Sequence, residues 1–241
     1  MPTKHKTVSR VVQILEFVVA NPGEATLTNI ADSLAAPRSS VHGFVKGLEA
    51  EGYLVESAGG SYVFGLGAHT LLASQSTSLV ELVAPTMRRI RDAIGETVTL
   101  AVLTGSDLTY VHSEPSPERI AYNPELHSRR PLWPTSCGKV FLAYPDNHGL
   151  VDEVVHNLDL DRTDVDEELD SVRRLGYGKN IGETVASVTA VAVGLMIGSN
   201  LAAAVSIGGP YARVADHLED IANEANRIMV DDHLTPLPST M

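Results

Sequence analysis

The sequence predicts an α+β protein of two domains, a small helical one followed by a larger one with a mostly antiparallel sheet. The chain has 241 residues, about twice the commonest domain size. Three amphipathic helical patterns and two short strands fill residues 1–66, whereas strand pairs interleaved with helices fill the remainder. With 44% hydrophobic and 20% charged residues, the composition excludes a disordered or collagen-like chain.

The first two helices are predicted from apolar spacing and from residues that end helices. Apolar residues recur three and four positions apart from Val8 to Val19, and Pro22 stops the pattern. A second, shorter pattern begins with Thr28 as its N-cap and ends before Pro37. We therefore expect two short helices that pack through their apolar faces.

Residues 38–52 predict a third helix whose exposed face is small and polar. Its buried stripe consists of Val41, Phe44, Val45 and Leu48. Two helices separated by about three residues, the second with small polar residues on its outer first turns, fit the major groove of DNA. The residues expected to contact DNA are Arg38, Ser39, Ser40, His42, Gly43 and Lys46. A three-helix packing module without DNA contact has the same spacing, so that alternative stays open.

The next segment predicts a wing, the β-ribbon of a winged helix-turn-helix. YLVES and SYVFG are separated by an Ala-Gly-Gly turn, which favours two short antiparallel strands. Residues 53–64 contain no Lys or Arg, so phosphate contacts from the wing depend on backbone N–H groups and on Ser57 or Ser61. We therefore expect a modest affinity for DNA.

The remaining elements predict a linker and an α+β domain. Weak helical periodicity over residues 67–80 indicates a linker helix between a domain at 1–66 and a domain at 81–241. TVTLAVLT and DLTYVHS predict two strands joined at Gly105 and Ser106. Helices are expected at Leu79–Ile94, Ser136–Ala143, Asn147–Val155, Val165–Arg174 and Ala212–Met229.

One long apolar segment has two interpretations. Residues 184–212 contain no charged side chain, and this uncharged segment is long enough to form a membrane-spanning helix. Gly198, Ser199 and Asn200 divide the segment into two pieces rich in valine and isoleucine, which favours a buried β-hairpin. The first residues, MPTKHKTVSR, do not resemble a secretory signal. We therefore expect no membrane association and a cytoplasmic location.

The charge distribution limits the kinds of partner. The formal net charge of −12 argues against a protein that coats nucleic acid without specificity. Residues 1–66 contain six acidic and five basic residues, so their net charge is −1. The net charge of residues 67–241 is therefore −11. The five basic residues are Lys4, Lys6, Arg10, Arg38 and Lys46.

Cys137 is the one cysteine of the sequence and the obvious candidate nucleophile. A thiol at the start of a helix has its thiolate favoured by the helix dipole, so a Cys137-dependent enzyme or thiol sensor is the alternative function. No spacing places a histidine beside the sulfur, and no histidine pair has metal-ligand spacing. We expect no catalytic residue, no metal ion and no cofactor.

Four stretches resemble, in the same order, the IclR family of bacterial transcription regulators. LTNIADSLAAPRSSVHGFVKGLEAEGYLV resembles the helix-turn-helix, and RRPLWPTSCGKVFLA, RRLGYGKNIGETVASVTAVAV and AAVSIGGPYAR resemble the effector domain. The resemblance implies a winged helix-turn-helix joined by a linker helix to a GAF/PAS-like effector-binding domain. It also implies a homodimer or a dimer of dimers (a homotetramer) that binds double-stranded operator DNA and is not an enzyme.

The turn over residues 134–138 predicts an effector site. Free backbone N–H groups at a helix start bind anions such as a carboxylate, and Lys139 follows directly. The resemblance places effector contacts at Ser136, Cys137, Asn180, Ala190, Ser206 and Gly208. To these we add Gly138 of the turn and Glu183, which is suited to a ligand hydroxyl, to a helix cap or to an Arg partner.

The expected effector is a small organic acid, aliphatic or aromatic. Its carboxylate is expected on the turn at residues 135–138, with its other polar groups near Asn180 and Ser206. Trp133 stands where a histidine is usual in the family, which changes the wall or the lid of the pocket.

Overall fold

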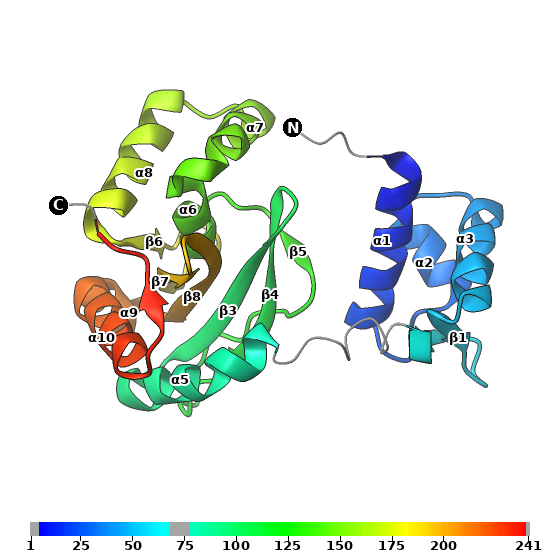
Figure 1. The fold of residues 1–241 in the computed structure, drawn as a ribbon, viewed down its shortest axis with the longest axis horizontal. Helices are drawn as coiled ribbons and strands as arrows, with labels where there is room; N and C mark the ends of the chain where they lie inside the picture. Colours follow the sequence, from blue (N-terminus) through cyan, green and yellow to red (C-terminus); the bar gives the residue numbers. More distant parts are fainter. Residues whose placement is uncertain (1–4, 68–77, 240–241) are drawn as a thin grey trace. The chain divides into compact units, whose positions relative to one another are not determined.

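The computed structural model describes residues 5–67 and 78–239, which belong to two compact units, Met1–Ser78 and Leu79–Met241 (Figure 1). Each unit has its own hydrophobic core. Residues 68–77 of the expected linker helix lie outside the described residues, and Leu79 and Val80 belong to the helix that follows. The expected boundaries at residues 66 and 80 therefore stay predictions.

The N-terminal unit contains three helices and a β-ribbon. These elements are α1 (Lys6–Ala20), α2 (Leu27–Ser33), α3 (Arg38–Ala50), β1 (Leu54–Glu56) and β2 (Tyr62–Phe64). Its core is formed by one apolar face of each helix together with the ribbon, through residues that include Ile14, Ile30, Val41, Val45 and Leu54. β1 and β2 pair antiparallel, with Val55 opposite Val63. The three helices and the ribbon confirm the architecture predicted from apolar spacing.

The start of α2 differs from the prediction. Thr26, not Thr28, is the N-cap: its side chain accepts a hydrogen bond from the Asn29 N–H at 3.2 Å. Thr26 also forms an antiparallel bridge with Ser61 at the end of the turn of the ribbon. Thr26 has an extended backbone, and the helix begins directly after it at Leu27, two residues earlier than an N-cap at Thr28 would give.

The larger unit is built on an antiparallel sheet. Within residues 78–239 the strands run in the order β5-β4-β3-β8-β7-β6, with β9 paired to β7. Their bounds are β3 (Thr97–Thr104), β4 (Asp107–Glu114), β5 (Arg129–Arg130), β6 (Tyr177–Ile181), β7 (Val188–Ile197), β8 (Asn200–Pro210) and β9 (Thr235–Pro236). The expected apolar hairpin is β7 and β8, which confirms the β interpretation of residues 184–212. No helix in the described part of the chain is long and apolar enough to cross a membrane.

Helices cover both faces of this sheet (Figure 1). One face packs against α5 (Leu79–Ile94) and α10 (Leu218–Asp231), and the other against α6 (Ser136–Ala143), α7 (His148–Leu158) and α8 (Arg162–Leu175). The prediction of one helix over residues 212–229 is wrong. The structure has α9 (Tyr211–Val214), a 3₁₀ turn (Ala215–His217) and then α10.

The helix α6 packs unusually tightly against its neighbours. A Cβ atom added to Gly138 would overlap the carbonyl oxygen of Leu132, and one added to Gly178 of β6 would overlap that of Ser136. Glycine at both positions therefore allows backbone to approach backbone. This packing fixes the start of α6 against the edge of the sheet.

We expect Gly138→Ala to destabilise the larger unit, Leu79–Met241, which we call the effector unit, by about 1–3 kcal/mol or more. This is the usual range for overpacking a filled interior. The obstacle is the Leu132 backbone rather than a flexible side chain. Urea unfolding followed by the fluorescence of Trp133, the single tryptophan, measures this unit directly. Gly47→Ala, which meets nothing within 4 Å, is the control and should leave that transition unchanged. Equal midpoints for Gly138→Ala and wild type would contradict the packing argument.

Candidate functional site

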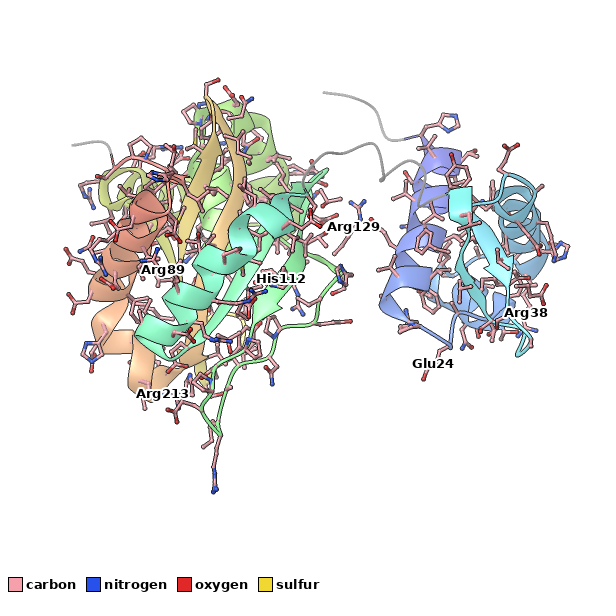
Figure 2. The ribbon with its side chains drawn as sticks, turned by 60° about the horizontal axis from the view of Figure 1, so that its bottom comes forward. Glu24, Arg38, Arg89, His112, Arg129 and Arg213 are labelled. Carbon is pink, nitrogen blue, oxygen red and sulfur yellow. The ribbon has the colours of Figure 1, made fainter. Side chains whose placement is uncertain are left out.

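The exposed face of α3 carries the residues expected to contact DNA. Val41 and Val45 are buried on the inner face of this helix. Arg38, Ser39, His42, Gly43 and Lys46 are exposed, and Ser40 is half-buried. Figure 2 shows Arg38 at the N-terminal end of α3. The helix thus presents small side chains and a positive charge on its first turns, which is the chemistry that major-groove binding needs.

Lys46 is already engaged within its own unit. Its Nζ lies 2.7 Å from Glu49 Oε2 and 3.1 Å from Glu56 Oε2, so it links α3 to β1. Hydrogen bonds to Glu49 and then Glu56 raise the pKa of Lys46. A phosphate at this position would compete with two carboxylates, so Lys46 contributes less net positive charge than the sequence implies.

The turn of the wing is occupied in a similar way. The hydroxyls of Ser57 and Ser61 lie 2.8 Å apart and form a hydrogen bond with each other. Ser61 is also buried against the start of α2. Ser57 is half-buried and Ser61 is buried, so the Ser57 hydroxyl is the more accessible of the two for a phosphate contact.

The effector unit contains a small polar cavity between α6 and the sheet. Its volume is about 20 Å³, enough for roughly one water molecule. Its walls come from α6 with its N-cap, four strands and two loops: Tyr110, Tyr122, Thr135, Ser136, Asn180, Thr184, Val188, Ala190 and Ser206. Four of the eight expected effector residues, Ser136, Asn180, Ala190 and Ser206, are therefore gathered around one space.

Strand pairing explains why these residues meet. Asn180 of β6 lies opposite Ala190 of β7, and Ala190 lies opposite Gly208 of β8. Ser206 is two residues before Gly208 and therefore faces the same side of β8. The small side chains of this row leave room above the sheet, which α6 and the tyrosines then close.

Hydrogen bonds between the walls hold the cavity closed. Ser136 Oγ and Ser206 Oγ lie 3.3 Å apart. Asn180 donates from Nδ2 to the carbonyl oxygen of Pro134 at 2.8 Å, and its Oδ1 accepts from the Thr184 hydroxyl at 3.4 Å. A ligand that enters must exchange some of these bonds for its own.

The start of α6 is partly satisfied by its own cap. Thr135 Oγ1 accepts from the Gly138 N–H at 3.0 Å, and the Lys139 N–H bonds to the Thr135 carbonyl. Among the described residues no acceptor is found for the N–H groups of Ser136 and Cys137. The expected anion site at this turn is thus reduced to two N–H groups and the helix dipole.

Tyr110 and Tyr122 were not identified from the sequence as cavity residues. Tyr110 lies in the expected strand, where its alternation with neighbouring polar residues is the one available signal. Tyr122 comes from the irregular segment between β4 and β5, and its ring lies against Gly208. No local pattern marks a loop residue that covers a distant glycine.

The other expected effector residues lie outside the cavity wall. Glu183 pairs with Lys139, whose Nζ lies 2.9 Å from Glu183 Oε1 and 3.1 Å from Glu168 Oε1. Lys139 is buried, with its ammonium group 5.1 Å from the centre of the Trp133 ring. The charge of Lys139 is therefore balanced by two carboxylates. The basic partner of Glu183 is a lysine, where an arginine was expected.

Cys137 is fully buried against the sheet. Burial raises the pKa of its thiol to about 12, although hydrogen bonds to Ser206 and Ser136 act in the opposite direction. Desolvation therefore opposes the thiolate form that a nucleophilic Cys137 would require. In residues 5–67 and 78–239, no three His, Cys, Asp or Glu side chains gather closely enough to hold a metal ion.

Both units match known protein families. The IclR helix-turn-helix domain matches residues 7–58, and the bacterial transcriptional regulator IclR C-terminal domain matches residues 71–230. The transcriptional repressor IclR of Escherichia coli is 24% identical over 227 residues, which are 88% of this chain and 82% of the repressor. The regulator KdgR of Dickeya chrysanthemi is 27% identical over 207 residues, covering 80% and 66%.

Solved structures share the fold over nearly the whole chain. An IclR-type regulator from Silicibacter has a TM-score of 0.76 at 22% identity, with 94% of each chain covered. An IclR homologue from Microbacterium hydrocarbonoxydans, solved in complex with 4-hydroxybenzoate, has a TM-score of 0.71 at 22% identity, covering 94% of this chain and 98% of the homologue. With its winged helix-turn-helix and its effector-binding domain, this chain is a DNA-binding transcriptional regulator that belongs to the IclR family.

Proposed function

We propose that this regulator reads a pseudo-palindromic operator through the exposed face of α3, as a homodimer or a dimer of dimers. The observation that carries the proposal is the pattern on α3, with Ser39 and His42 exposed opposite the buried Val41 and Val45. Two such helices related by a twofold axis would contact successive major grooves. The near-neutral charge of residues 1–66 supports recognition of bases rather than general attraction to phosphate.

The proposed effector is a small organic acid held in the cavity between α6 and the sheet. Polar groups from Ser136, Asn180 and Ser206 around a partly apolar space support a ligand of this kind. The homologue bound to 4-hydroxybenzoate supports it as well. Because the cavity of about 20 Å³ has room for roughly one water molecule, binding of an organic acid requires its walls to separate.

We further propose that the chain acts in the cytoplasm by binding and without catalysis. A protein that reads an operator works where bacterial DNA lies. The protonated, buried Cys137 offers no nucleophile near neutral pH, which removes the main support for an enzyme or a thiol sensor. Regulation would then arise from a ligand that binds one conformation of the effector domain more tightly than the other.

His42→Ala or Ser39→Ala should weaken operator binding, or relax its sequence preference, by about 1–3 kcal/mol for each residue that contacts a base. The operator is first obtained by selecting bound sequences from a random DNA pool with the full chain. Affinities for that sequence and for single-base variants are then measured by fluorescence anisotropy. His156→Ala on the exposed surface of α7 is the control. Unchanged affinity and preference in both α3 variants would refute the assignment.

Operator binding should depend moderately on salt. If about three phosphates are neutralised per subunit, a dimer has Z near 6 and a slope of log K against log salt of about −5. Because Lys46 is already paired with Glu49 and Glu56, we do not expect more than about three neutralised phosphates per subunit. Titrations between low and high salt measure the slope directly. A slope steeper than about −10 would show that basic residues of the effector domain also contact DNA.

Ser206→Leu should abolish the effector response and leave DNA binding without ligand nearly unchanged. Leucine at this buried wall position would fill the small cavity, whereas Ser206→Ala keeps it open and serves as the control. A thermal-shift screen of carboxylic acids, beginning with 4-hydroxybenzoate, is followed by operator titrations with each hit. In wild type we expect a coupling of about 1–3 kcal/mol. A Ser206→Leu variant that responds like wild type would place the effector elsewhere.

A further inference from the structure

Arg130 lies beside the aromatic wall of the effector cavity. It is the second residue of β5 and pairs with Leu108 of β4, two residues before Tyr110. The guanidinium carbon is 5.3 Å from the centre of the Tyr110 ring, a cation–π contact. Tyr110 in turn lines the cavity, so a full positive charge lies against one of its walls.

The hydrogen bonding of this guanidinium is incomplete. Its Nε is buried and has no hydrogen-bond partner among the described residues. Its Nη2 is 3.6 Å from Glu125 Oε2, beyond hydrogen-bond distance, and the Glu125 side chain is 70% exposed. An arginine presents five N–H donors in a planar fork that matches a carboxylate. Arg130 therefore has donor capacity that the protein itself does not use.

The other positive groups near α6 are less suitable. Lys139 is balanced by Glu168 and Glu183. The start of α6 offers only partial charge, because Thr135 caps the Gly138 N–H. A carboxylate that loses its hydration needs a full countercharge or several donors. Arg130 supplies both.

The neighbouring tyrosines are compatible with a bound anion. Burial raises the pKa values of Tyr110 and Tyr122, and the charge of Arg130 partly opposes that effect at both residues. Both hydroxyls therefore stay protonated at neutral pH and are able to donate hydrogen bonds. Neither ring adds negative charge that would repel a carboxylate.

We propose that Arg130 is the residue that makes this cavity selective for acids, because its guanidinium receives the carboxylate of the effector. This inference rests on the proposed effector function and changes one part of it: the carboxylate binds at Arg130 and not at the start of α6. The opposite end of the ligand then faces Ser136, Asn180 and Ser206. The carboxylate of Glu125, 3.6 Å from Nη2 of Arg130, would compete with the effector for this guanidinium.

The test uses matched acids and amides, which have nearly the same shape but differ in charge. The pairs are acetate and acetamide, benzoate and benzamide, and 4-hydroxybenzoate and 4-hydroxybenzamide. Calorimetry on the full chain should show that wild type binds at least one acid at least tenfold more tightly than its amide. Arg130→Gln should lose at least tenfold in affinity for that acid and change by less than twofold for the amide. Arg130→Lys keeps the positive charge but lacks the planar set of N–H donors. Its affinity for the acid should lie between those of wild type and Arg130→Gln.

Two further variants separate local charge from general effects. Arg129→Gln removes the same charge from the adjacent residue, whose side chain points to the opposite side of the strand, and should bind the acid like wild type. Glu125→Gln removes the competing carboxylate and should not weaken acid binding. Thermal melts of each variant establish that the domain is folded.

The outcomes distinguish this inference from the proposed function. Equal losses of acid affinity in Arg129→Gln and Arg130→Gln, or none in Arg130→Gln, would overturn the role of Arg130 and leave an acid-responsive regulator. Binding of amides in preference to acids would overturn the selectivity as well. If no acid or amide binds wild type, both the inference and the organic-acid effector are wrong.

Discussion

The cavity that we propose as the effector site depends on the close packing of α6 against two neighbouring backbone segments. Gly138 lies against the Leu132 carbonyl and Gly178 against the Ser136 carbonyl, with no space for a Cβ atom in either contact. This packing places Ser136 next to Ser206 and buries Cys137 against the sheet. The same constraint therefore creates the polar wall of the cavity and buries the thiol, which raises its pKa. A looser helix would expose the sulfur and separate the hydroxyls.

Buried carboxylates of the larger unit are paired with basic residues from distant segments of the chain. The buried carboxylate of Glu96 is held by Arg213, and that of Glu114 by Arg88 and His112. A paired buried charge is tolerated because its lost hydration is replaced by hydrogen bonds. The cavity itself is lined by neutral groups. We therefore expect the incompletely paired guanidinium of Arg130 beside it to influence which ligands bind.

The small size of the cavity has a consequence for regulation. Its walls are joined by hydrogen bonds among Ser136, Ser206, Asn180 and Thr184, and Tyr122 covers Gly208. A ligand stabilises the open arrangement only to the extent that it binds this state more tightly than the closed one. The cost of opening is thus part of the effector affinity. Substitutions in the covering loop should alter affinity even where they never contact the ligand.

Elements with strong periodicity were determined by the sequence, because apolar spacing directly reports which face of a helix or strand is buried. The three N-terminal helices follow from it, whereas the ribbon and the apolar hairpin follow from the turn residues that divide their strands. The family motifs located four of the nine residues that line the cavity. Contacts between distant segments were decided only in three dimensions. Ser61 shifted the cap of α2 to Thr26, and Glu168 and Glu183 took the charge of Lys139. Tyr122 reached the cavity from a loop, and Arg130 reached the Tyr110 ring from a two-residue strand. Both segments are too short or irregular to have a period, so only tertiary packing determined their positions.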